Sequence, residues 1–388
     1  MNILFFLKQF PLYGGVERIT ITLASALQQR GYNVYIMSER GEAEELLADL
    51  DEDVTYLYFP SHTYISKENV NYFMSIVHNF EIRYIINQGC YPEVNRFLNK
   101  CRDRHNAKVI SVLHNDPLAG FQSLIQIRIS KDWKSIVKRM VWPVYKLWVY
   151  WLVIGNFRQV VSFSSRIVLL SDSFQDNFCR YSGLTNKNKL VTIPNCFEFA
   201  DIKISEPNKA KIILYVGRVV EEQKRLSRLF EIWNILSKRH IDWKLQIVGD
   251  GEKMNDYKKY VENNKIPRVF FEGYQKDVST YMQQASFLSL VSDYEGFPMV
   301  IVEAMHNRCI PVVYGSYSAV YDIIDNGVSG IIVPPFNQEI YINELEKLMN
   351  NVEQSKKMAD KAYEKTTCYS IERILPLWEE LLNSENKI

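Results

Sequence analysis

The stretch FLSLVSDYEGFPMVIVEAMHNRCIPVVY, residues 287–314, contains the structural unit from which the fold can be predicted. Short apolar runs form its two ends, at 287–291 and 310–314, and residues 298–307 between them suit a helix. A buried strand, a helix and a second buried strand in this order are typical of two parallel strands joined by a crossover helix. Because apolar runs and amphipathic stretches alternate in this way along almost the whole chain, we predict an α/β fold with parallel sheets.

The alternation occurs in two series, which predicts two doubly wound sheets. The predicted strands are 2–7, 33–38, 53–58, 82–87, 108–113, 166–171 and 190–194, and then 212–216, 244–248, 269–273, 287–291, 310–314 and 330–333. A length of 388 residues also favours two domains over a single core. The predicted parts are an N-terminal domain at 1–200, a polar linker at 201–211, a C-terminal domain at 212–368 and a helical end at 369–388.

The composition is that of a globular protein, with 47% hydrophobic and 23% charged residues. The net charge of +1 provides no overall positive field, so nucleic acid is not an expected partner. The six cysteines include no C-x-x-C pair, which favours reduced thiols in the cytoplasm over a zinc site or a disulfide framework. No stretch reaches the roughly 18 uninterrupted apolar residues of a membrane-spanning helix.

Residues 125–166 differ from the rest because they carry eight cations and one acid, Asp132, together with four tryptophans. Cations beside aromatic residues are typical of a helix that lies in the headgroup layer of a membrane. The alternative is a helical pair packed on the first domain with solvated lysines. The one-sided charge favours a peripheral contact with an anionic membrane surface. The cations are Arg128, Lys131, Lys134, Lys138, Arg139, Lys146, Arg158 and Arg166, and the tryptophans are Trp133, Trp142, Trp148 and Trp151.

Two carboxylates accompany the helix predicted at 298–307. Ligands of doubly wound sheets bind at the carboxyl ends of the strands, where Glu295 lies just ahead of the helix and Glu303 lies within it. Eight residues of helix correspond to a rotation of about 80°, so the two side chains point to nearby but distinct places. One can therefore contact a sugar ring while the other binds ribose hydroxyls. The alternative is an acidic turn followed by a solvated helical glutamate.

Three further groups follow predicted strands. Arg218 and Lys224 follow the strand 212–216, where cations can stabilise a diphosphate leaving group. Gly14 and Gly15 precede a helix predicted at 16–30, which allows close approach of the backbone to a ligand. His114 follows the strand 108–113 and can hydrogen-bond a sugar hydroxyl, although structural histidines are common in such places. No D-x-D motif stands in a suitable loop and no histidines have metal-ligand spacing, so we expect no metal site.

Taken together and in order, eight motifs resemble the retaining GT-B glycosyltransferases of family four, the group 1 glycosyltransferases. They are GGVER (14–18), VLHND (112–116), VTIPN (191–195), YVGRVVEEQK (215–224), QIVGDGE (246–252), FFEGYQKDV (270–278), EGFPMVIVEAM (295–305) and NGVSGIIVPP (326–335). The resemblance implies two Rossmann-like domains that face each other across a cleft, with the acceptor on the N-terminal side. It also implies that the helix near 370–384 crosses back to the first domain.

The resemblance assigns roles to the candidate residues. It implies that the Gly14–Gly15 loop packs against the donor phosphates and sugar and that His114 lies under the donor sugar. Arg218 and Lys224 match residues that hold the diphosphate, whereas Glu295 matches the residue at the transferred sugar. Glu303 matches the ribose ligand, and backbone amides around Met299 and Val300 add to diphosphate binding. Arg225 stands where a small residue or asparagine often follows the lysine.

The sequence therefore predicts retaining, metal-independent transfer, without a cofactor, from a nucleotide-diphosphate sugar to a glycan. We favour a UDP-sugar as donor and a lipid-linked acceptor in bacterial capsule or lipopolysaccharide assembly at the inner face of the cell membrane. One alternative is a nucleotide-sugar epimerase of the same architecture, which would need no acceptor surface. Another is a non-catalytic scaffold that binds the donor. The combination of Arg218, Lys224, Glu295 and Glu303 favours the transferase.

Overall fold

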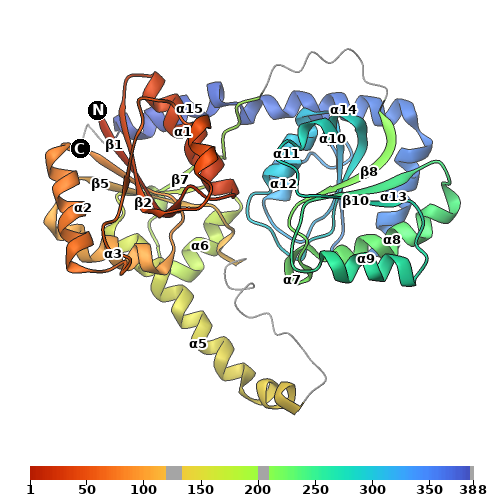
Figure 1. The fold of residues 1–388 in the computed structure, drawn as a ribbon, viewed down its shortest axis with the longest axis horizontal. Coiled ribbons are helices and arrows are strands. Elements are labelled where there is room, and N and C mark those ends of the chain that lie inside the picture. Colours follow the sequence, from red (N-terminus) through yellow and green to blue (C-terminus); the bar gives the residue numbers. More distant parts are fainter. Residues whose placement is uncertain (119–132, 200–208, 385–388) are drawn as a thin grey trace. The chain divides into compact units, whose positions relative to one another are not determined.

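A computed structural model describes residues 1–118, 133–199 and 209–384, and the chain divides into two compact units (Figure 1). Unit 1 consists of Met1–Glu198 together with Tyr369–Ile388, and unit 2 consists of Phe199–Cys368. The end of the chain thus belongs to unit 1. There its last helix, α15 (Ile371–Ser384), packs on α1 (Gly15–Gln29), and the Tyr84 hydroxyl donates a hydrogen bond to the Leu382 carbonyl at 2.7 Å.

Unit 1 is built on a seven-stranded parallel sheet in the order β3-β2-β1-β4-β5-β6-β7. Its strands are β1 (Asn2–Phe10), β2 (Asn33–Arg40), β3 (Thr55–Tyr58), β4 (Tyr84–Asn87), β5 (Lys108–Leu113), β6 (Arg166–Leu169) and β7 (Leu190–Thr192). Besides α1 and α15, the described α-helices of unit 1 include α2 (Lys67–Asn79), α3 (Pro92–Cys101), α5 (Trp133–Phe163) and α6 (Phe174–Ser182). The strand order reverses between β1 and β4, so the switch point lies at the carboxyl ends of these two strands.

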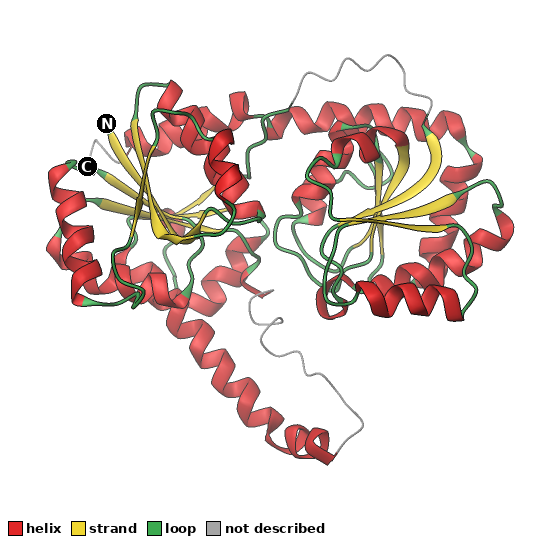
Figure 2. Cartoon of the chain, viewed as in Figure 1, coloured by secondary structure: helices red, strands yellow, loops and turns green. Residues whose placement is uncertain are grey.

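Unit 2 is built on a six-stranded parallel sheet in the order β10-β9-β8-β11-β12-β13, which reverses between β8 and β11. Its strands are β8 (Ala210–Val216), β9 (Lys244–Val248), β10 (Val269–Gly273), β11 (Ala285–Leu290), β12 (Ile310–Tyr314) and β13 (Ile331–Val333). Its α-helices are α7 (Glu221–Lys224), α8 (Leu226–Arg239), α9 (Met254–Asn263), α10 (Ser279–Gln284), α11 (Met299–His306), α12 (Val320–Ile323), α13 (Gln338–Asn350) and α14 (Val352–Thr366). Helices cover both faces of each sheet (Figure 2).

The structure confirms the predicted strands. They could be predicted because central parallel strands are buried on both faces and therefore appear as continuous apolar runs. In β1 and β8, for example, Ile3–Leu7 and Ile212–Val216 are buried throughout. The predicted linker extends two residues too far, since Ala210 and Lys211 already belong to β8. Residues 201–208 of that prediction lie outside the described residues, and Lys209 directly precedes β8.

The helix predicted at 224–237 is wrong in one respect. Two helices occupy this region, α7 and α8, and Arg225 between them adopts the left-handed conformation with φ 51° and ψ 44°. A right-handed helix cannot continue through such a residue. The break matters for the site because Lys224 is the last residue of α7 and Arg225 directly follows it.

From Trp133 onwards, the described part of the basic aromatic segment forms one long helix, α5. Pro143 lies inside α5. Residues 125–132 lie outside the described residues, as do the side chains of Lys134, Lys138 and Arg139. Among the described residues, no helix has the length and hydropathy that a membrane crossing requires.

Candidate functional site

The predicted site residues divide between the two units. Gly14, Gly15 and His114 belong to unit 1, where the glycines follow β1 and His114 follows β5, and β4 lies between these two strands in the sheet. In unit 2 the loops after β8 and β11 meet at the other switch point. The residues predicted there are Arg218, Lys224, Glu295, Met299, Val300 and Glu303.

Lys224 and Glu295 form an ion pair at the switch point of unit 2. The Lys224 Nζ atom lies 2.6 Å from Glu295 Oε1, and the side chains are only 12% and 7% exposed. The residues lie 71 positions apart in the sequence, and the adjacency of β8 and β11 brings their loops together. A lysine that is shielded from water and paired with a carboxylate is well placed to act on an anionic ligand, since the surrounding low dielectric strengthens its charge interactions.

Gln223, which was not among the predicted site residues, links two of the predicted charged residues, Arg218 and Glu295. Its Nε2 atom donates to Glu295 Oε2 at 3.3 Å and to the Tyr294 carbonyl at 3.2 Å, and its Oε1 atom accepts from Arg218 at 3.0 Å. The amide thus connects the loop after β8 to the loop after β11. Its position next to Lys224 was the only signal in the sequence, because a lone glutamine carries no recognisable spacing.

The start of α11 lies at the same switch point. The predicted helix 298–307 begins one residue later, at Met299, and Pro298 is its N-cap without a side-chain capping bond. Met299 and Val300 are therefore the first two residues of the helix, where backbone N–H groups have no intrahelical acceptor. Glu303 lies one turn further on and is half-buried. This arrangement can bind a phosphate group at the helix start.

Gly249, within the motif at 246–252, makes a close approach of two backbone segments possible at this edge of the sheet. It has φ 134°, and a Cβ atom built on it would lie 1.9 Å from the Gly217 carbonyl oxygen. Only glycine fits such a position without displacement of the backbone. The contact holds the loop after β9 against the loop that carries Arg218, as does the hydrogen bond from the Val219 amide to the Asp250 carbonyl at 2.8 Å.

In unit 1, His114 is held by Gln88, which directly follows β4. The distance from His114 Nε2 to Gln88 Oε1 is 2.6 Å. Because an amide oxygen only accepts hydrogen bonds, the Nε2 atom carries the hydrogen. Burial lowers the pKa of His114 to about 4, against which a hydrogen bond with Asn195 raises it. The imidazole is therefore neutral at pH 7.

The Gly14–Gly15 turn begins α1, with Gly14 as its N-cap. Gly14 has an extended conformation, φ −163°, that any residue adopts, so its backbone does not require glycine. The space beside it is taken by Glu17, whose Oε2 atom would lie 2.2 Å from an added Cβ. Burial raises the pKa of Glu17. In the sequence, Glu17 stands out only as part of the motif GGVER.

Two family models match the chain and together cover residues 13–365. Glycosyltransferase Family 4 matches residues 13–200, and Glycosyl transferases group 1 matches residues 197–365. The chain belongs to the group 1 glycosyltransferases. It is thus an enzyme that transfers a sugar from a donor to an acceptor.

One relative of this glycosyltransferase matches nearly the whole chain, and another matches about half of it. An uncharacterized glycosyltransferase of Haemophilus influenzae is 24% identical over 400 residues, which cover 97% of this chain and 99% of that protein. The amylovoran biosynthesis glycosyltransferase AmsD of Erwinia amylovora is 30% identical over 189 residues, which cover 48% of this chain and 51% of AmsD.

Solved structures show that the fold is GT-B, with two Rossmann-like domains. The lipopolysaccharide outer core galactosyltransferase WaaB has a TM-score of 0.72 at 17% identity, and the match covers 99% of this chain and 100% of WaaB. HepE from Anabaena, solved in complex with UDP-glucose, has a TM-score of 0.75 at 17% identity, and the match covers 98% of this chain and 99% of HepE.

Proposed function

We propose that this glycosyltransferase moves a sugar from a UDP-sugar to a glycan on a lipid carrier, with retention of configuration and without a metal ion. The observation that carries the proposal is the cluster at the switch point of unit 2, where the Lys224–Glu295 pair lies beside Arg218 and the start of α11. Cations and a carboxylate in one place match the two groups that the bond of the donor joins, the diphosphate and the sugar. The diphosphate is anionic, whereas the sugar offers hydroxyl donors.

In the proposed reaction, Arg218 and Lys224 stabilise the diphosphate as its bond to the sugar breaks. Negative charge builds up on the leaving oxygen, and fixed cations in a site shielded from water stabilise it more than water does. The amides of Met299 and Val300 add donors to the phosphate. These groups supply the charge stabilisation that a divalent cation provides in metal-dependent phosphate chemistry.

The carboxylates and the leaving group complete the transfer. Glu295 accepts hydrogen bonds from hydroxyls of the transferred sugar, and Glu303 accepts them from the ribose. The leaving phosphate oxygen takes the proton of the acceptor hydroxyl on the same face of the sugar. The new bond therefore forms where the old bond breaks, and configuration is retained. His114, neutral at pH 7, binds a sugar hydroxyl and does not act as a general acid.

The choice of donor and pathway rests on similar proteins. HepE was solved with UDP-glucose, which supports a UDP-sugar. WaaB is a galactosyltransferase of the lipopolysaccharide outer core, and AmsD acts in amylovoran biosynthesis, which supports a role in bacterial surface polysaccharides.

The lipid-linked acceptor and the peripheral membrane location rest on α5. The second half of this helix packs on α3 and α6 through apolar residues that include Val149, Val153 and Phe157. Further towards its start, α5 carries an exposed apolar face with helical spacing, formed by Val144, Leu147, Trp148, Trp151 and Leu152. A helix that is apolar on a solvent-facing side and rich in tryptophan is suited to the interface of a bilayer.

The exposed face of α5 adds an apolar contribution to the positive charge of residues 125–166. Trp148 and Trp151 are 56% and 57% exposed. Lys146 is exposed as well, and its Nζ atom lies 5.6 Å from the centre of the Trp142 ring. The aromatic side chains enter the headgroup layer, and the cations of 125–166 select an anionic surface.

Turnover with defined donors tests the reaction. The purified protein is incubated with UDP, GDP, ADP and CMP sugars and a lipid-linked glycan primer, with EDTA and then with magnesium, and the product anomer is assigned by NMR. We expect transfer from one UDP-sugar in EDTA, with the anomeric configuration of the donor retained. Glu295→Ala and Lys224→Ala lose most turnover, whereas Lys357→Ala, at an exposed ion pair of unit 2, retains it. Wild-type rates in both site variants would remove the site assignment.

Vesicle binding tests the membrane surface. Vesicles of phosphatidylcholine with phosphatidylglycerol are sedimented with wild-type protein, with Trp148→Ser/Trp151→Ser, and with a variant in which Lys134, Lys138, Arg139 and Lys146 are replaced by Glu. Both variants are expected to lose binding, whereas the control Ile241→Ser, at an exposed apolar residue of unit 2, binds like wild type. Unchanged binding of both α5 variants would rule out this surface.

A further inference from the structure

The turn that presents Lys224 contains an unfavourable backbone conformation. Arg225 follows Lys224 with φ 51° and ψ 44°, a left-handed conformation that residues with a Cβ atom rarely adopt. Such a conformation persists only where the surroundings hold it in place, and it is found mostly near functional sites. The contacts of Arg225 therefore indicate what the turn is built to position.

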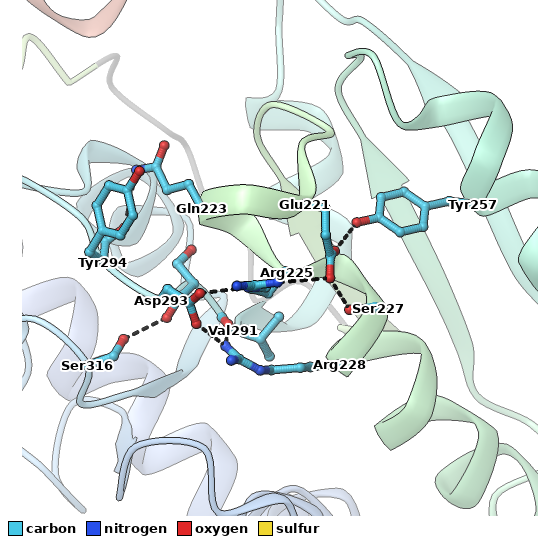
Figure 3. A network of polar contacts seen from close by, with 11 residues as sticks. Glu221, Gln223, Arg225, Ser227, Arg228, Tyr257, Val291, Asp293, Tyr294 and Ser316 are labelled. Atoms are coloured by element: carbon cyan, nitrogen blue, oxygen red, sulfur yellow. Dashed lines mark hydrogen bonds and ion pairs between the residues drawn. The ribbon is translucent and has the colours of Figure 1, made fainter. Parts of the chain in front are cut away.

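Asp293 accepts hydrogen bonds from two arginines, Arg225 in this turn and Arg228 in α8 (Figure 3). Arg225 Nε donates to Asp293 Oδ2 at 2.6 Å, and an Nη atom of Arg228 donates to Asp293 Oδ1 at 2.5 Å. Arg228 also donates to the Val291 carbonyl at 3.2 Å. Both oxygens of one carboxylate are thus engaged by guanidinium groups, which fixes its orientation more firmly than a single contact would.

Glu221 holds the other end of the turn. It accepts hydrogen bonds from the Ser227 hydroxyl at 2.7 Å and from the Tyr257 hydroxyl, and its carboxylate lies 3.5 Å from Arg225 (Figure 3). Burial, followed by the hydrogen bond to Glu221, raises the pKa of Tyr257, so the phenol keeps its hydrogen. The turn is therefore anchored to α8 and α9 at its start and to the loop after β11 at its end.

The backbone joins the same two segments. The Asp293 amide donates to the Gln223 carbonyl at 2.8 Å, and the Ser316 hydroxyl, in the loop after β12, supports the loop after β11 by a hydrogen bond to the Ser292 carbonyl at 2.6 Å. Asp293 lies two residues before Glu295, and Arg225 lies one residue after Lys224. The Arg225–Asp293 pair is consequently the nearest charged contact, along both chain segments, to the Lys224–Glu295 pair.

We infer that Asp293 is a positioning residue which, through Arg225 and Arg228, sets the Lys224 ammonium against the Glu295 carboxylate. The inference rests on the proposed function of that pair. Asp293 acts through these two arginines and has no direct role toward the donor or the acceptor in this proposal. Its carboxylate stabilises the left-handed conformation of Arg225, and this conformation places Lys224 in the site. Mispositioning of a catalytic group by about 1 Å costs on the order of a hundredfold in rate, so loss of this contact lowers turnover strongly.

Two substitutions separate the side-chain contact from the backbone turn. Arg225→Asn removes the contact with Asp293 but keeps a residue that tolerates the left-handed conformation. Asp293→Asn keeps the size of the side chain and removes its charge. Asp360→Asn is the matched control, because it breaks another Arg–Asp pair of unit 2, Arg308–Asp360 at 2.9 Å, away from the site.

We expect Arg225→Asn and Asp293→Asn each to lower kcat by about 10- to 100-fold. The dissociation constant of UDP should stay near that of wild type, because Arg218 and the start of α11 still bind the diphosphate. The loss in the double variant should be clearly smaller than the product of the two single losses, since both changes remove the Arg225–Asp293 contact. Thermal midpoints are measured in parallel, and Asp360→Asn should keep the wild-type kcat.

The outcomes distinguish this inference from the proposed function. Wild-type kcat in Arg225→Asn and Asp293→Asn, with Lys224→Ala inactive, would overturn the positioning role and leave the function intact. Losses that add in the double variant would also overturn it, because the two residues would then act independently. If Lys224→Ala itself turns over like wild type, the proposed site is wrong.

Discussion

Removal of one partner from the Lys224–Glu295 pair should destabilise unit 2, whereas removal of both should not. The pair is only 12% and 7% exposed, with 2.6 Å between Nζ and Oε1, so Lys224→Met leaves a buried carboxylate whose remaining side-chain donor, among the residues that the structure describes, is the Gln223 amide. Breaking a buried pair in this way costs about 3–5 kcal/mol. For a unit of this size that corresponds to a fall of roughly 6–20 °C in the melting temperature.

The double variant Lys224→Met/Glu295→Gln carries no buried charge, and its melting temperature should return to within a few degrees of wild type. A buried ion pair replaced by neutral residues of similar volume is often neutral in stability. Turnover should be absent in both variants. Differential scanning calorimetry of wild type, both single variants and the double variant gives the coupling between the residues.

Lys357→Met is the stability control, since its ion pair with Glu353 is exposed and should contribute less than about 1 kcal/mol. A melting temperature of Lys224→Met equal to that of wild type would refute this prediction, because the buried Glu295 carboxylate would then not need the lysine as its partner. It is equally refuted if the double variant melts below both single variants.

Two further predictions concern pH and backbone packing. The pKa of His114 is lowered by burial to about 4 from 6.5, so between these pH values the unfolded chain binds more protons than the folded one. The free energy of unfolding therefore falls by about 3 kcal/mol in all as the pH drops from 6.5 towards 4. In urea titrations, His114→Gln should lack this fall. The same pH dependence in His114→Gln and wild type would contradict the lowered pKa of His114. Gly249→Ala places a Cβ atom 1.9 Å from the Gly217 oxygen and should destabilise unit 2 by about 3 kcal/mol or more, whereas Gly273→Ala, with open space at φ 71°, should cost about 1 kcal/mol. Equal melting temperatures for these two glycine variants would show that the close approach is not required.

The parallel sheets could be predicted because burial on both faces leaves a direct trace in the sequence. Runs such as Ile212–Val216 are apolar without interruption, since neither face of a central strand meets water. Candidate residues at the ends of strands could be found as well, because the end of each apolar run marks the end of a strand. The chain order predicted which loops lie at carboxyl ends, and the strand order in the sheets then made neighbours of the loops after β8 and β11.

The left-handed turn at Arg225 could not be predicted from local propensity. Arginine favours right-handed helix, and residues 224–237 have helical periodicity, so a continuous helix was the better local solution. The contact with Asp293, 68 residues away in the sequence, supports the turn. Gln223 was missed for a similar reason, because its partners Arg218 and Glu295 come together only when the sheet has formed.

By itself the sequence determined the class of fold, its two series of strands, the membership of the glycosyltransferase family and the candidate residues, because each depends on patterns along the chain. Only the tertiary structure decided that Lys224 pairs with Glu295, that Arg225 and Arg228 converge on Asp293, and that α5 exposes an apolar face at Trp148 and Trp151. These features depend on which strands become neighbours and which side of a helix finds a packing partner. Such choices arise from long-range contacts, which no local pattern in the sequence records.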